Sequence, residues 1–231
     1  MQESQSLLDI FILIMSRGLP TTLALTLIAL LIGFAVGVGL ALLRVYGPRE
    51  LQWIAQGYEK TLRGIPLLVL LMIFGIGLSG FFAWAGPGTG ALFVGAVFAL
   101  ALRSAAYQSE IFRGAILSVD PGQMMAAQSV GMNNLQATRH IILPQAFRLS
   151  LPGWTNEYAV VIKDSSLALL IGVRDIMYQA DAFKWVYPEI FFAIMIIVAI
   201  IYFIFTYPIT KYVGESMTSR LRRLGLGGGK Q

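Results

Sequence analysis

The sequence has no cysteine and only one histidine, His140. The lack of cysteine excludes disulfides, iron–sulfur clusters and thiolate metal sites, and a single histidine excludes a multi-histidine metal centre or proton relay. Charged residues are also scarce, at 13% of the chain, whereas a soluble domain has about 25%. We therefore expect no metal in this chain, and we exclude the class of soluble globular proteins.

The sequence is strongly apolar, with 57% hydrophobic residues and a mean hydropathy of +0.72. A membrane-spanning helix needs about 20 mostly apolar residues. Five stretches qualify, and Gly86-Pro87-Gly88 separates the second from the third because glycine and proline favour turns. We predict one all-α integral membrane domain over residues 1–231, with five transmembrane helices at about 20–43, 65–84, 90–110, 149–173 and 190–209.

The distribution of lysine and arginine predicts the orientation of these spans. Four cations lie in residues 44–63, three in 113–148 and five in the tail from 211, so one side of a five-span arrangement holds 12 of the 17. The other side holds three: Arg17, Arg174 and Lys184. Because cytoplasmic loops are rich in lysine and arginine, we expect the N-terminus outside and the C-terminus in the cytoplasm of a multi-pass plasma-membrane protein. The net charge of +5 then reports topology and not nucleic-acid binding.

Two features near the N-terminus concern the first span. Residues 6–15 are expected to form a short interfacial helix before the span. Gly33 and Gly37 stand four positions apart, and small residues at this spacing let helices approach closely in lipid. The two glycines therefore predict a close helix contact, either within this chain or between two subunits.

The segment between the third and fourth spans, residues 113–148, is far longer than the other loops. Asp120 can cap a helix whose first position is Pro121, and Gly131 interrupts that helix. This first half of the segment therefore predicts a short helix that ends at a glycine.

The second half of the same segment predicts another short helix. Asn133 or Asn134 can cap it, and it is expected to end near Pro144. Long, structured loops are usually functional. The helix pair either lies on the membrane surface or forms a docking surface for a cytoplasmic partner.

This loop resembles the EAA loop of the membrane subunits of ABC importers. In that family an Ala-Ala pair is followed by a glycine and later by an apolar stretch that ends in Leu-Pro. Here the pair is Ala126-Ala127, the glycine is Gly131 and the stretch is Ile141–Pro144, while Met125 stands where the family has glutamate. The ATPase-coupling residues that the resemblance implies are Gln123, Met125, Ala126, Ala127, Gly131 and Pro144.

Other motifs are similar to those of the polar amino acid permeases of this family, which include histidine, arginine, glutamine and glutamate types. Residues 63–68 resemble the RGxPLL entry into the second span, and residues 105–115 resemble the AAY…EIFRGA segment. Asn156-Glu157 and residues 163–167 resemble the fourth-span pattern. The resemblance implies a structural role for Arg63, Gly64, Pro66, Glu110 and Arg113.

The resemblance implies a type I ABC importer-like bundle that is the transmembrane subunit of an ATP-driven importer for a polar or charged amino acid. Such a chain is no enzyme. It forms a dimer with itself or with a similar permease, and two cytoplasmic ATPase subunits, which hold ATP and Mg²⁺, act on the 121–148 loop. An extracytoplasmic solute-binding protein delivers the amino acid. Residues 225–230 are glycine-rich and include Lys230, but they lack the Walker A spacing, so no cofactor is expected in this chain.

Polar residues inside the third and fourth spans are the candidates for binding the amino acid. They are Arg103, Tyr107, Asn156, Glu157, Lys163 and Asp164. A charge inside a span costs at least about 2.5–3.5 kcal/mol, so it faces protein or water. Arginine can hold a carboxylate bidentately and an acidic side chain can accept an ammonium, which together suit a zwitterion. The alternative is structural pairing between helices, and Arg103 either contacts the substrate or pairs with Glu157.

Two other functions stay open from the residues alone. A passive channel or secondary carrier for small polar solutes would show flux without any ATPase. A scaffold that transports nothing would tolerate the loss of Arg103 and Glu157.

Overall fold

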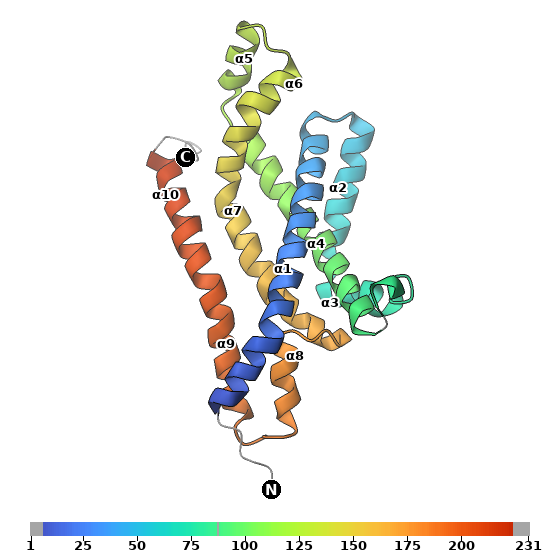
Figure 1. The fold of residues 1–231 in the computed structure, drawn as a ribbon. Coiled ribbons are helices and arrows are strands. Elements are labelled where there is room, and N and C mark those ends of the chain that lie inside the picture. Colours follow the sequence, from blue (N-terminus) through green and yellow to red (C-terminus); the bar gives the residue numbers. More distant parts are fainter. Residues whose placement is uncertain (1–6, 87, 224–231) are drawn as a thin grey trace.

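The computed structural model describes residues 7–86 and 88–223, and Figure 1 shows its helices arranged as an elongated bundle. Within these residues there is no β-strand, which confirms the predicted all-α class. Three predicted features lie partly or wholly outside the described residues: Ser6 of the interfacial helix, Pro87 of the turn and the glycine-rich stretch 225–230.

The chain order of the helices is as follows. The α-helices are α1 (Leu7–Tyr46), α2 (Arg49–Gly64), α3 (Leu67–Leu71), α4 (Thr89–Leu117), α5 (Pro121–Ser129), α6 (Asn134–Ala137), α7 (Leu143–Asp164), α8 (Ile176–Asp181), α9 (Phe191–Pro208) and α10 (Ser216–Arg223). Shorter π-helical segments are η1 (Met72–Gly77), η3 (Thr138–Ile142) and η6 (Ile209–Glu215). Shorter 3₁₀-helical segments are η2 (Ala83–Ala85), η4 (Ser165–Ile171) and η5 (Ala182–Lys184).

Three helices among the described residues are long and apolar enough to cross a membrane: Leu7–Tyr46, Thr89–Leu117 and Phe191–Ser219. The count becomes four if α2 and the α3–η1 segment, Leu67–Gly77, are taken together as one bent span. These helices contain the predicted first, third and fifth spans. The predicted second and fourth spans have a different form.

The segment predicted as the second span, at about 65–84, is not one continuous helix, since its helix covers Leu67–Gly77 and meets α2 at an angle of 102°. Pro66 has no N–H to donate and forces the preceding Ile65 into an extended conformation, at φ −87° and ψ 130°. After Gly77 the chain continues through turns to the short η2. The uncharged segment therefore forms a bent, partly irregular structure.

The predicted fourth span at 149–173 is also shifted. The helix α7 begins earlier, at Leu143, and its α-helical part ends at Asp164, where the tighter 3₁₀ segment η4 takes over. Polar and charged side chains along α7 explain why its composition alone does not mark it as a membrane span. The polar side chains inside the bundle thus lie mainly on α7 and on the helices next to it.

A separate interfacial helix at 6–15 is not formed, since the described part of it is the first turns of α1. Ile10 and Ile14 are buried against Ile176 of α8 and Ile194 of α9. This apolar contact fixes the beginning of α1 in line with the rest of the helix, which passes through Pro20 without a break.

The Gly33–Gly37 pair brings α1 against α4. A Cβ atom at Gly33 would lie 2.7 Å from Gln108 Nε2, and one at Gly37 would lie 2.9 Å from Gln108 Cβ. Since real Cβ atoms do not come that close, a side chain at either position would force Gln108 or the helices to shift. Of the two interpretations from the sequence, the structure shows close packing within the chain.

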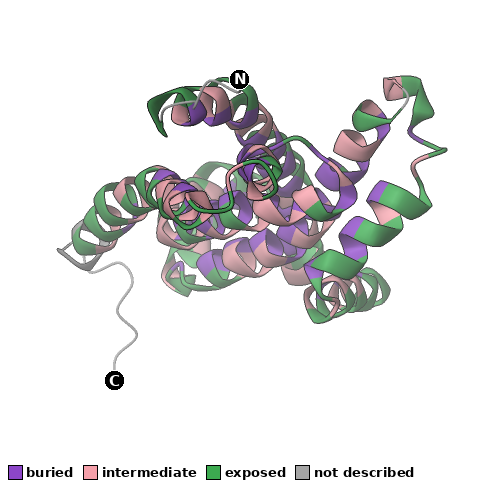
Figure 2. Cartoon of the chain, turned by 90° about the horizontal axis from the view of Figure 1, so that it is seen from below, coloured by how far each residue is buried: buried purple, intermediate pink, exposed green. Residues whose placement is uncertain are grey.

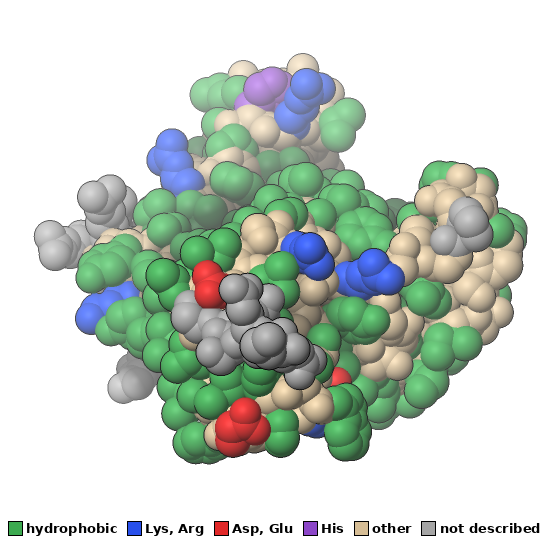
Figure 3. Space-filling model, turned by 60° about the horizontal axis from the view of Figure 1, so that its bottom comes forward, with side chains coloured by type: hydrophobic (Ala, Val, Ile, Leu, Met, Phe, Trp, Pro, Cys, Tyr) green, Lys and Arg blue, Asp and Glu red, His purple; other side chains and the backbone are tan. Residues whose placement is uncertain are grey.

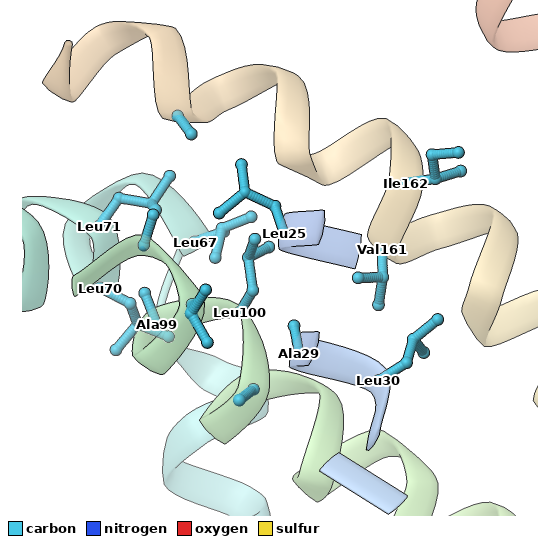
Figure 4. Close-up of a cluster of buried hydrophobic side chains, with 14 of the residues drawn as sticks. Leu25, Ala29, Leu30, Leu67, Leu70, Leu71, Ala99, Leu100, Val161 and Ile162 are labelled. Atoms are coloured by element: carbon cyan, nitrogen blue, oxygen red, sulfur yellow. The ribbon is translucent and has the colours of Figure 1, made fainter. Parts of the chain in front are cut away.

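The largest hydrophobic core lies where α1, α3, α4 and α7 meet, and Figure 4 shows leucine and alanine side chains from these helices converging there. The labelled members are Leu25, Ala29, Leu30, Leu67, Leu70, Leu71, Ala99, Leu100, Val161 and Ile162. Further clusters occupy the two ends of the bundle. Figure 2 shows that buried residues face between the helices while the outward faces are exposed.

The helices differ greatly in how far the bundle surrounds them. In the most apolar part of α4, 56% of the residues are buried, against 17% in the span formed by α9 and its continuation. The exposed residues of α9 are almost all apolar, including Phe192, Ile200 and Phe203. An apolar outer surface of this kind suits lipid or another helix and does not suit water.

We expect a Gly33→Val substitution to destabilise the bundle, because the added methyl groups collide with Gln108 and Ser104. Overpacking costs about 1–3 kcal/mol, so the melting temperature of the purified protein in detergent should fall by about 2–10 °C. Gly39→Val is the matched control, since no atom lies within 4 Å of a Cβ at that position. Equal melting temperatures for the two variants would show that the close contact is unimportant.

Candidate substrate site and coupling loop

One face of α4 carries the polar residues that the sequence singled out. Arg103, Tyr107 and Glu110 are spaced by four and three residues, which places them one above the other on a helix. The alanine-rich stretch around them favours the helix and leaves room for neighbouring helices. Arg103 stands about halfway along α4, within the part long enough to cross a membrane.

Arg103 forms an ion pair with Asp164, the last residue of α7, through its Nη1 atom. Of the two roles left open for Arg103, contact with the substrate or pairing with Glu157, the structure shows pairing, but with Asp164 in place of Glu157. Both paired side chains are only about a quarter exposed or less, at 22% and 25%. The Nε atom of Arg103 is buried without a hydrogen-bond partner. The arginine thus retains donor capacity that Asp164 does not use.

Glu157 ends a chain of hydrogen bonds that runs between α7 and α4. Ser104 Oγ donates to Glu157 Oε1 at 2.7 Å, and Gln108 Nε2 donates to Ser104 Oγ at 3.0 Å. Trp154 Nε1 donates to Gln108 Oε1 at 2.9 Å, and the same amide nitrogen of Gln108 donates to the carbonyl of Leu30 at 3.2 Å. Glu157 is 4% exposed, so the hydrogen bond from Ser104 takes the place of a bond to water, and the rest of the chain holds Ser104 in position.

Sequence reasoning missed Ser104, Gln108 and Trp154. A signal was present, because Ser104 and Gln108 are polar residues four positions apart within a predicted span. Asn156 and Lys163 are exposed on α7 and therefore do not belong to the buried chain around Glu157. The six candidates thus divide into a paired group on α4 and α7 and two exposed residues on α7.

Tyr107 lies between two arginines. The guanidinium carbon of Arg103 is 5.2 Å from the centre of its ring, and that of Arg63 is 5.9 Å away. Arg63 Nη2 is in turn 3.5 Å from Glu110 Oε1, and Arg113 Nη2 is 2.7 Å from Glu110 Oε2. Glu110 is thus shared by two arginines near the end of α4.

A second buried carboxylate, Glu59 of α2, was also missed. It is fully buried, accepts a hydrogen bond from Arg44 Nη1 at 2.7 Å and accepts another from Ser109 Oγ at 2.5 Å. These bonds tie α2 to the end of α1 and to α4. Because α2 is a charged helix by composition, Glu59 gives no sequence signal that distinguishes it from an exposed residue.

The loop between α4 and α7 projects from one end of the bundle, at the top of Figure 1. The Asp120 side chain accepts a hydrogen bond from the Gly122 N–H at 2.6 Å and caps α5, which begins at Pro121. Gly131 has φ +88°, a conformation that other residues rarely adopt. The expected helix start and its glycine stop are both present.

Asn133 caps the second helix of the loop in a capping box. Its Oδ1 atom accepts from the Gln136 N–H at 2.9 Å, and Gln136 Oε1 accepts from the Asn133 N–H at 3.0 Å. The expectation that this helix ends near Pro144 is wrong, because α6 continues through η3 into α7. Proline is tolerated there because it stands in the first turn of α7, next to the π-helical segment.

Several apolar side chains of the loop are exposed. Met125 is 62% exposed, Val130 76% and Leu135 77%. Ala126 is exposed and Ala127 is buried, while Gln145 Nε2 donates to Gln123 Oε1 at 3.3 Å. The described residues contain no group of three metal-ligating side chains. The loop thus presents a rigid, partly apolar surface, and the site between α4 and α7 presents paired charges.

Comparison with known proteins shows which protein family this chain belongs to. A family model described as "Binding-protein-dependent transport system inner membrane component" matches residues 29–216. The chain belongs to this family. The match covers α2, α4, the projecting loop and α7, together with the part of α1 that contacts them.

Relatives of this inner membrane component are amino acid permeases. The probable glutamine ABC transporter permease protein GlnM of Bacillus subtilis (strain 168) is 36% identical over 193 residues, which cover 84% of this chain and 87% of GlnM. The arginine transport system permease protein ArtQ of the same strain is 34% identical over 209 residues, which cover 89% of this chain and 91% of ArtQ.

A solved structure agrees with the family. It is the crystal structure of an amino acid ABC transporter with histidines, which resembles this inner membrane component with a TM-score of 0.77 and 34% identity. The likeness covers 96% of this chain and 100% of that chain. The fold is therefore that of a type I ABC importer permease.

We expect Asn133→Ala to loosen the second helix of the loop, because the substitution removes the capping box. Loss of such a cap costs about 1 kcal/mol, so amide hydrogen exchange over residues 134–138 should become about fivefold faster. Asn134→Ala is the matched control, since Asn134 only accepts a side-chain hydrogen bond from Gln128. Similar exchange rates in both variants would contradict this role of Asn133.

Proposed function

We propose that this chain is the transmembrane subunit of an ATP-driven importer for a polar or charged amino acid. The observation that carries the proposal is the projecting loop: two helices, each with a side-chain cap, are joined at Gly131 and expose Met125, Val130 and Leu135. A rigid apolar surface of this kind suits a protein partner. The EAA-like sequence of the loop supports an ATPase subunit as that partner, which would act on residues 121–148.

The charged groups between α4 and α7 support an amino acid as the substrate. Arg103 can offer its unused donors to a carboxylate, and Asp164 or Glu157 can accept an ammonium group. Asn156 and Lys163 would complete the lining, and Tyr107 would act on it by holding Arg103 through its ring. The printed names of the relatives agree, since they include a glutamine permease and an arginine permease.

The proposed arrangement in the plasma membrane has five spans within one domain. The bent α2–α3–η1 pair and the polar α7 supply the two spans that are not long apolar helices. The start of α1 and the projecting loop lie at opposite ends of the bundle, as expected if the N-terminus is outside and the loop inside (Figure 1). The lower end, seen in Figure 3, is mostly hydrophobic with few charged side chains.

We propose the following assembly. A second copy of this chain or a similar permease completes the pathway, and two ATPase subunits with ATP and Mg²⁺ bind at the cytoplasmic loops. A solute-binding protein delivers the amino acid on the outer side, where residues 174–189 form part of its docking face. The apolar outer surface of α9 supports contact with lipid or a neighbouring helix.

The decisive experiment is co-purification followed by reconstitution. The chain is expressed with the ATPase and binding protein encoded next to it, and uptake of radiolabelled amino acids is measured in liposomes. ATP-dependent uptake by the complex, and none by the chain alone, supports the importer. Flux through the chain alone would favour a passive channel or secondary carrier instead.

We expect Gly131→Ile to uncouple ATP hydrolysis from uptake without preventing membrane insertion. A β-branched residue at φ +88° is strained by about 1–2 kcal/mol, so the junction between the two loop helices should change shape. The measurement is substrate-stimulated ATPase activity of the reconstituted complex. Gly114→Ile is the control, because Gly114 is helical with open space around it. Full stimulation in the Gly131 variant would refute the role of this junction.

A further inference from the structure

Two breaks interrupt the helices around α4. The first separates α2 from α3 at Ile65-Pro66, where the chain bends by 102°. The second is the change from α-helix to 3₁₀-helix after Asp164, between α7 and η4. Helix breaks of this kind are places where packed segments can change direction.

Each break has a charged residue in its last helical turn, and both charged residues reach the same face of α4. Asp164 pairs with Arg103, and Arg63 lies 3.5 Å from Glu110. Arg103 and Glu110 are seven positions apart and therefore share that face. The residues at the two breaks thus contact α4 at two positions, Arg103 and Glu110, which lie about two helical turns apart.

The Tyr107 ring contacts the arginine at each of these two positions. Its ring centre is 5.2 Å from the guanidinium carbon of Arg103 and 5.9 Å from that of Arg63. A ring face attracts a guanidinium, and the attraction grows when water is excluded. Because each arginine also has its own carboxylate, the ring can hold two like charges near one another. Moving either arginine therefore changes the surroundings of the other.

The same face leads on to the projecting loop. Glu110, which holds Arg63, also accepts from Arg113 Nε at 2.8 Å, and Arg113 begins the 113–148 segment. At the other end, the buried Nε of Arg103 has no hydrogen-bond partner. Among these charged residues, Arg103 is thus the one with a hydrogen-bond donor left for an incoming ligand.

From these contacts, and on the basis of the function proposed above, we propose that Tyr107 is a positioning residue that couples the two helix breaks. An amino acid that draws Arg103 away from Asp164 would alter the ring contact, then Arg63 at the α2–α3 bend, and through Glu110 the start of the loop. Tyr107 then acts through the two arginines, and its aromatic ring is needed while its hydroxyl is not.

A double-mutant cycle in the reconstituted complex tests the coupling. Arg63→Gln, Asp164→Asn and the double variant are made in the natural background and in a Tyr107→Leu background. The readout is the ratio of substrate-stimulated to basal ATPase rate. With Tyr107 present, the double variant should differ from the product of the single effects by about threefold or more. In the Tyr107→Leu background, where the ring is absent, the single effects should multiply.

Tyr107→Phe is the matched control, because it keeps the ring and removes only the hydroxyl. It should retain the stimulation ratio, whereas Tyr107→Leu should reduce it by about fivefold. Equal losses in both variants would overturn the proposal. So would a Tyr107→Leu variant that binds the amino acid more weakly but stays fully coupled, since Tyr107 would then contact the substrate itself.

A second measurement uses the chain without its ATPase. The sequence has no cysteine, so Val69→Cys in α3 and Leu170→Cys in η4 provide unique sites for spin labels. Both positions are about half exposed, at 45% and 50%. The distance distribution in nanodiscs should be narrow with the natural Tyr107 or with Tyr107→Phe, and broad with Tyr107→Leu. An unchanged distribution in the Tyr107→Leu variant overturns the proposal, even if the complex shows no ATPase stimulation and the importer function itself fails.

Discussion

The constraint on which this structure depends is that hydrocarbon offers no partner to a polar group. Each buried charge must therefore find its partner inside the protein. Glu59 is held by Arg44 and Ser109, and Glu157 is held by Ser104. All of these bonds except the one from Arg44 come from α4. Of the three long apolar helices, the one most surrounded by the bundle is thus also the one that donates a hydrogen bond to each of these two carboxylates.

This central position gives α4 two different faces. Toward α1 it must be approached closely, which is why Gly33 and Gly37 have no side chain. Toward α2 and α7 it carries charged and aromatic groups that fasten the ends of those helices. Close packing at the two glycines and the hydrogen bond from Gln108 to the Leu30 carbonyl fix one side of α4, while ion pairs, which can exchange partners, hold the other. The second side is therefore where a charged solute can act, and the same helix leads directly to the projecting loop.

Local chemistry explains what could be predicted from the sequence. Asp120, Pro121 and Gly131 determine the first loop helix through caps and backbone angles that need no distant partner. Of the five spans predicted from apolar runs, the first, third and fifth likewise coincide with long apolar helices. The partner of Arg103, the burial of Glu59 and the bend at Pro66 depend on how helices meet in space, so periodicity and composition could not give them. The helix end expected near Pro144 was wrong for the same reason. A π-helical segment beside Pro144 lets the helix continue.

The loop surface shows why the family glutamate can be replaced by Met125. The loop does not rely on a charge at this place for its own structure, since its helices are held by Asp120 and by the Asn133 capping box. Met125, Val130 and Leu135 together leave apolar area exposed, and covering such area stabilises by about 25 cal/mol per Å². A partner that covers these side chains therefore gains affinity from hydrophobic contact. In the proposed assembly, a pull by this partner would pass through the capped helices into α4 and α7, where the paired charges lie.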